Sequence, residues 1–90
     1  MKYMITWDIP SDSYQETVET FLGGSPLPDG VRSLGRWHVP GSVQGFHLLE
    51  SDDPALVAQE VAHWSKLCEI GVTVVIGDED AAASLTKVYG

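Results

Sequence analysis

The sequence VRSLGRWHVPGSVQGFHLLES, residues 31–51, decides the fold. β-Branched, aromatic and leucine residues make residues 31–39 and 44–51 two predicted strands, and the segment Pro40–Val43 joins them. So short a connection makes the two strands an antiparallel hairpin. The middle of the chain is therefore a β-hairpin, and the elements on either side of it must pack around this hairpin.

A strand and a helix are predicted on the N-terminal side of the hairpin. Residues 1–9 carry apolar and polar side chains in alternation, and Pro10 ends this strand. Ser13, with Glu16 three residues later, is a capping-box pattern that begins an amphipathic helix. Gly23–Gly24 supplies the left-handed cap at the end of that helix.

The C-terminal side predicts a helix, a strand and a last helix. Asp53 is an N-cap before a proline at the first helical position, and the apolar stripe of this helix ends at Cys68. Residues 69–77 form a buried strand, and Asp78–Asp80 begin an alanine-rich helix whose dipole favours their carboxylates. The order β-α-β-β-α-β plus a terminal helix predicts a single α+β, ferredoxin-like domain over residues 1–90. Its two main helices should lie on one face of a four-stranded antiparallel sheet.

The composition excludes several classes of partner. Thirteen acidic residues against five lysines and arginines give a net charge of −8, which repels nucleic-acid phosphates and anionic membranes. The chain has no run of the ~20 apolar residues that span a bilayer and no signal-peptide pattern. The single cysteine excludes an intrachain disulfide. We expect a cytoplasmic protein that binds neither nucleic acid nor membrane, with a core small enough to gain stability from a partner.

The register of the hairpin decides which side chains share a face. If the two residues that border the turn pair with each other, Trp37 lies opposite Phe46 and Arg36 opposite His47. One face is then aromatic, and the other holds Arg36, His38 and His47 together. A turn of odd length would instead place Trp37 beside His47. We expect the aromatic face to meet the helices.

The face with the arginine and histidines is then expected to be free of helices. The strand patterns add further residues to it: Met4, Thr6, Leu34, Leu49, Thr73 and Val75. Such a face is too apolar to be left in water. Because only the short alanine-rich helix remains to cover it, the simplest cover is the same face of a second copy. The sequence therefore predicts a homodimer in which sheet packs on sheet.

The strongest candidate site consists of His38, His47 and Arg36. Arginine binds anions through a bidentate fork, and histidine exchanges protons near neutral pH. We expect His38 and His47 as catalytic proton carriers and Arg36 and Trp37 as ligand-binding residues. The ligand would be a small anionic or aromatic organic molecule in a cavity between the two sheets. In the alternative, the protein is a non-catalytic binding or structural module, and the same cluster only stabilises the dimer.

No metal or cofactor is predicted. A metal site built on His38 and His47 has no evident third ligand. The segment Gly23–Ser25 lacks the lysine and the preceding strand of a phosphate-binding loop.

The chain resembles a family of short bacterial domains of unknown function, which is similar to a branch of the dimeric α/β-barrel superfamily. The segments that carry the resemblance are Lys2–Trp7, Leu34–His38, Gly45–Phe46, Glu50–Pro54 and Trp64–Ser65. They run over nearly the whole chain, and the sequence Gly-Arg-Trp-His is the most specific. The resemblance implies a homodimer whose two sheets form a barrel. It implies no reaction, because the family has none assigned.

The resemblance also leaves the chemistry open. Haem-degrading monooxygenases of that superfamily rely on an asparagine, a tryptophan and a histidine, whereas this chain has no asparagine and no histidine after His63. Their set of residues is therefore not transferred. Cofactor-independent monooxygenases of aromatic polyketides and small isomerases stay compatible, because they depend on a cavity more than on a fixed motif. Whether the protein is an enzyme remains open at this point.

Overall fold

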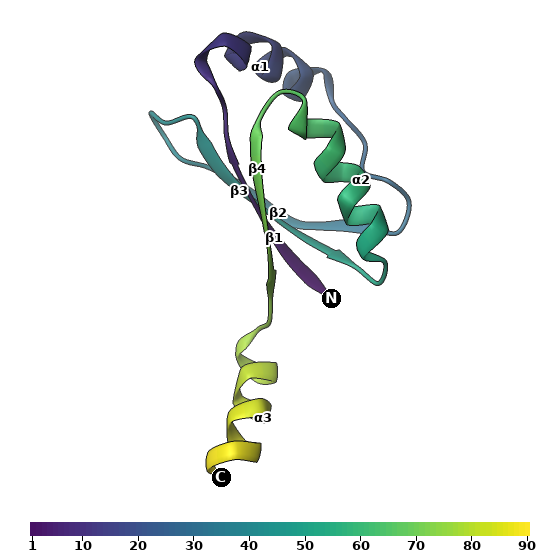
Figure 1. Cartoon of the computed structure of the whole chain (residues 1–90), viewed down its shortest axis with the longest axis vertical. Helices are drawn as coiled ribbons and strands as arrows, with labels where there is room; N and C mark the ends of the chain where they lie inside the picture. Colours follow the sequence, from purple (N-terminus) through teal and green to yellow (C-terminus); the bar gives the residue numbers. More distant parts are fainter.

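The computed structural model describes residues 1–90 as one antiparallel sheet with helices on one of its faces (Figure 1). The strands are β1 (Lys2–Asp8), β2 (Val31–His38), β3 (Gln44–Ser51) and β4 (Glu69–Val75). The helices are the 3-10 helix η1 (Ser11–Ser13) and the α-helices α1 (Tyr14–Gly23), α2 (Pro54–Ser65) and α3 (Asp78–Tyr89). The strand order is β2-β3-β1-β4. The predicted ferredoxin-like α+β fold is therefore confirmed.

The core lies between the sheet and α2. Its buried side chains are Tyr3 and Ile5 of β1, Val31 of β2, Leu49 of β3 and Val57 of α2. Leu49 has no exposed surface at all. The residues that alternate with these along the strands lie on the other face of the sheet, which no helix covers.

One helix start is as predicted and the other is not. Asp53 caps α2, because its Oδ1 accepts a hydrogen bond from the backbone N–H of Ala55 at 2.9 Å. The prediction of a capping box at α1 is wrong, since the Ser13 side chain makes no cap hydrogen bond. Its hydroxyl instead donates to the carbonyl oxygen of Leu67 at 2.7 Å. A contact between residues far apart in the sequence has replaced the local one.

The predicted register of the hairpin is confirmed. The backbone N–H of Val39 donates to the carbonyl of Gln44 at 3.0 Å. Trp37 consequently lies opposite Phe46, and Arg36 lies opposite His47. The register shifts at one point, between residues 33 and 35.

The assignment of the two faces was wrong. His47 is two residues from the fully buried Leu49, so it shares the face that meets the helices. Arg36 and His38 lie on that face too, and Trp37 and Phe46 lie on the helix-free face. The side chains that join Phe46 there are those expected on the other side: Met4, Thr6, Thr73 and Val75. The aliphatic residues of β1 and β3 are buried against the helices, and they decide which face of the sheet the helices cover. The aromatic pair of the hairpin does not decide it.

α3 stands apart from the rest of the chain. It continues the direction of β4 away from the sheet (Figure 1), and none of its residues is buried. The radius of gyration is 15.3 Å, whereas a compact chain of this length has about 12 Å. None of the helices combines the length and the apolar character that crossing a bilayer would require.

Trp7 of β1 lies over Gly45 of β3, and this contact gives a first prediction. A Cβ atom on Gly45 would collide with the Trp7 indole, so Gly45→Ala must displace a large ring. We expect Gly45→Ala to lower the free energy of unfolding by about 1–3 kcal/mol in urea titrations. Gly23→Ala is the control, because nothing lies within 4 Å of its new methyl group. Equal stability of Gly45→Ala and wild type would show that the indole does not rest on Gly45.

Candidate functional site

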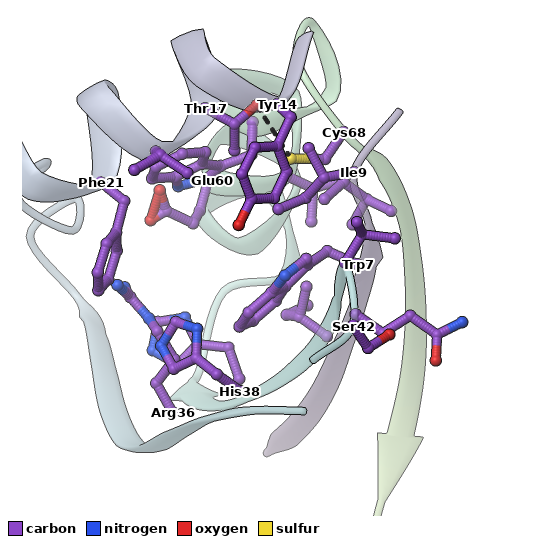
Figure 2. A pocket seen from close by; sticks show the side chains of 18 of the residues that line it. Trp7, Ile9, Tyr14, Thr17, Phe21, Arg36, His38, Ser42, Glu60 and Cys68 are labelled. Atoms are coloured by element: carbon purple, nitrogen blue, oxygen red, sulfur yellow. Dashed lines mark hydrogen bonds between the residues drawn. The ribbon is translucent and has the colours of Figure 1, made fainter. Parts of the chain in front are cut away.

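A cavity of about 330 Å³ lies between the sheet and the two helices α1 and α2 (Figure 2). Most of its lining side chains are apolar or aromatic, and the charged or titratable ones are Tyr14, Arg36, His38, His47, Glu60 and Cys68. The cavity therefore belongs to a single chain. The expectation of a cavity between two sheets is not met by this one, because the arginine and histidines face the chain's own helices.

Aromatic rings bound the cavity on opposite sides. The His38 ring makes edge-to-face contacts with Trp7 and Phe21, with ring centroids 5.4 Å and 5.2 Å apart. Figure 2 shows Phe21 and Trp7 on either side of the space, with Arg36 and His38 below it and Tyr14 above it. Such walls favour a flat apolar ligand, because aromatic edges and faces attract one another beyond simple burial.

Arg36 brings a positive charge to the cavity. Its guanidinium carbon lies 5.4 Å from the centroid of the Phe21 ring, a cation–π distance. The one ion pair of the structure joins Arg32 and Glu50 through neighbouring strands, so no carboxylate lies within 4 Å of Arg36. A guanidinium stays charged in proteins. Arg36 is thus a cation without a paired anion beside an apolar space.

His47 lies at the floor of the cavity as a neutral side chain. It is buried, and its Nε2 is 2.8 Å from the hydroxyl oxygen of Ser33. Burial, and then the charge of Arg36, lower the pKa of His47 from 6.5 to about 4. At neutral pH this imidazole holds no extra proton. Its lowered pKa makes His47 a poor proton carrier at neutral pH, the role that the sequence predicted for it.

Glu60 of α2 completes the polar part of the site, and the sequence analysis missed it. Its side chain is buried, with 6% relative exposure, and lines the cavity. Burial raises the pKa of Glu60, whereas His63, Arg36 and a hydrogen bond from Trp64 act to lower it. The signal was present in the sequence: Glu60 falls on the apolar stripe of α2, three residues after Val57.

Trp37 and Cys68 supply no reactive group to the cavity. Trp37, predicted to bind the ligand, lies on the helix-free face and does not line the cavity. The Cys68 thiol is buried, 4.0 Å from the Thr17 hydroxyl, and burial raises its pKa. A thiol in such a place is protonated and a poor nucleophile.

The neutral state of His47 predicts acid sensitivity. Its folded-state pKa lies below its unfolded value, so its contribution to stability is complete above about pH 6.5 and is lost as pH falls toward about 4, on the order of 3 kcal/mol in all. His47→Gln should therefore lose less free energy of unfolding than wild type between about pH 7 and pH 4.5. Urea titrations at several pH values measure this difference. The exposed His63→Gln serves as the control, and equal losses in His47→Gln and wild type would contradict the prediction.

Comparisons with known proteins identify a family. The chain is 34% identical over 68 residues to histidinol dehydrogenase of Aliivibrio fischeri (strain ATCC 700601 / ES114), which covers 76% of this chain but 14% of that protein. No solved structure matches the chain. Residues 1–89 match the domain of unknown function DUF3303. This match confirms the resemblance to short domains of unknown function, and the chain belongs to the DUF3303 family.

Proposed function

We propose that the protein binds a small organic anion with an aromatic body in the cavity between its sheet and its helices. The observation that carries this proposal is the position of Arg36, which has no carboxylate partner and stands beside a cavity walled by aromatic rings. The volume of about 330 Å³ is at the lower end of the ~300–1,000 Å³ typical of small-molecule sites.

The charge of the site favours an anion although the whole chain is acidic. Arg36 is solvent-exposed and makes no ion pair, so a bound carboxylate or enolate would supply the counter-charge that it lacks. A guanidinium offers two parallel N–H groups, which suits the two oxygens of a carboxylate. The aromatic rings on either side would then contact the body of the ligand.

His38 is the candidate catalytic residue of this proposal. It lies on the same strand as Arg36, two residues along, and its ring is held between Trp7 and Phe21. A histidine so placed would exchange a proton with a bound anion. The alternative is a non-catalytic module in which His38 only positions the ligand or packs against the rings.

We also propose that the protein is a homodimer. The chain exposes 6173 Å², whereas a compact monomer of 9.8 kDa exposes about 5,200 Å². The excess of about 1,000 Å² matches the ~800 Å² per partner that a stable interface buries. Three unpartnered surfaces contribute to it: the helix-free face, where Trp37 and Phe46 are exposed, the stripe of α3 formed by Leu85, Val88 and Tyr89, and the exposed Val72 and Val74 of β4.

A second copy is the occupant that fits these surfaces. The helix-free face carries the apolar side chains of Met4, Phe46 and Leu48. Its charged residues are of both signs: Lys2, Asp8, Arg32, Glu50 and Glu69. It therefore offers no surface of one sign to a strongly charged partner. Sheet faces of this kind pack on one another about a two-fold axis. α3 is too short to be a stable helix alone. Like the helix-free face, it would therefore be stabilised by packing against a second copy.

The proposed location and partners follow from charge and redox state. A net charge of −8 disfavours nucleic acid as a partner. The only cysteine is free, as is usual for proteins of the cytoplasm. We therefore propose a cytoplasmic protein whose partners are a second copy and a small molecule.

The ligand proposal predicts binding of aromatic carboxylates. We expect 2-naphthoate to quench tryptophan fluorescence and to raise the melting temperature of wild type. Arg36→Met should weaken this binding by roughly 10–100-fold, because a charge-assisted hydrogen bond contributes about 1.5–3 kcal/mol. Arg32→Met, on the opposite face of the sheet, is the matched control and should bind like wild type. If Arg36→Met and Arg32→Met bind equally, or if no aromatic carboxylate binds wild type, the proposal fails.

The dimer proposal predicts a mass of twice 9.8 kDa in size-exclusion chromatography with light scattering. Phe46→Glu places a charge at the centre of the helix-free face, and Leu85→Glu places one on the stripe of α3. We expect either substitution to yield a monomer, because burying an unpaired charge is costly. Ala58→Glu, on the exposed side of α2, should remain dimeric. A monomeric wild type would exclude the proposed assembly.

A further inference from the structure

Glu60 is a buried carboxyl group in the same cavity as Arg36, and the proposed function does not yet use it. The Glu60 side chain is more deeply buried than any other charged group, at 6% relative exposure. It makes no ion pair, although Arg36 is close enough to act on its charge. Figure 2 shows Glu60 on the opposite side of the cavity from Arg36, with Phe21 between them along the wall. The two groups thus face one space into which a ligand would enter.

We propose that an anion enters this cavity together with a proton, and that the carboxyl group of Glu60 holds that proton in the complex. This inference rests on the proposed function, because it concerns the ligand of the same cavity. The ligand carries a negative charge, and the proton on Glu60 compensates for it.

The charges of the cavity give the reason. With Glu60 ionised, the charges of Glu60 and Arg36 cancel, and an added anion would leave two negative charges around one guanidinium. With Glu60 protonated, the charge of Arg36 is left for the anion to neutralise. Two carboxylates that share a poorly solvated site cannot both stay ionised, so one of them takes up a proton.

Burial moves Glu60 toward the protonated form before any ligand binds. Its burial raises its pKa, and the opposing effects of His63, Arg36 and Trp64 are smaller than that of burial. A bound anion would pair with Arg36 and so weaken the effect by which Arg36 lowers the pKa of Glu60. The protonated carboxyl would then donate a hydrogen bond to the ligand, which an ionised carboxylate would repel.

Other titratable groups face Glu60 and must be distinguished from it. Tyr14 of α1, His38 of β2 and His47 of β3 line the same cavity, as does Cys68, directly before β4. His47 is neutral at neutral pH for the reasons given above. His38, whose imidazole also lines the cavity, is the competing proton carrier.

The inference narrows the class of ligand. A monoanion with an oxygen that accepts a hydrogen bond fits, as in an aromatic carboxylate or an enolate. A dianion would require a second positive charge, whereas Arg36 is the one arginine or lysine that lines the cavity. An organic cation would meet Arg36 with no anion left to balance it once Glu60 is protonated.

Calorimetric titration with 2-naphthoate tests the inference. Titrations in two buffers with different ionisation enthalpies, repeated between about pH 5 and pH 9, give the number of protons taken up on binding. We expect uptake that approaches one proton in wild type as the pH rises above the pKa of Glu60 in the free protein. In that range the affinity should fall about tenfold per pH unit. Glu60→Gln mimics the protonated carboxyl and should bind with no proton uptake and with a flat pH profile.

The outcomes separate this inference from the proposed function. If 2-naphthoate does not bind wild type, both fail. If it binds without proton uptake, or if Glu60→Gln still takes up a proton, only this inference is overturned. His38→Gln should keep the proton uptake, and loss of the uptake in that variant would assign the proton to His38 instead.

A measurement on wild type makes the inference testable even if Glu60→Gln does not fold. The carboxyl carbon of glutamate has a different NMR chemical shift in its protonated and ionised states. On addition of 2-naphthoate at neutral pH, the carboxyl signal of Glu60 should move to the protonated value. A signal that stays at, or moves to, the ionised value would overturn the proposal.

Discussion

The complete burial of Leu49 is the constraint on which the rest of the structure depends. Strand side chains alternate, so a buried Leu49 also turns His47 toward the helices, and the pairing of β3 with β2 carries Arg36 and His38 to the same side. The same alternation sends Trp37 to the helix-free face. One aliphatic residue in the core therefore decides which polar side chains line the cavity and which aromatic ones remain outside.

Burial then sets the charge of the cavity. It shifts the pKa of His47 downward and that of Glu60 upward, because both shifts favour the neutral form. Arg36 is the exception, since a guanidinium keeps its charge. A chain with a net charge of −8 thus presents one unpaired cation to an apolar space. This local reversal of charge is what directs the proposed function toward an anion.

The exposed surface of the chain and its small core both support the proposed dimer. Only 12 of 90 residues are buried, and both α3 and the helix-free face of the sheet lack a partner within the chain.

The order of elements, the strand register and the cap at Asp53 follow from the sequence, since each depends on neighbouring residues or on the length of one turn. The capping box at Ser13 did not form, because Leu67 offers this hydroxyl a carbonyl oxygen that no local pattern reveals.

The sequence by itself determined the ferredoxin-like order, the register of the hairpin and the grouping of Arg36, His38 and His47 on one face. Only the tertiary structure decided that this face is the inner one, because alternation fixes which residues share a face but not which face the helices cover. It also placed Glu60 of α2 across the cavity from Arg36 of β2, an arrangement that depends on how the helix packs on the sheet. A helical stripe shows that Glu60 is buried, but its neighbour across the cavity is a property of the packed molecule alone.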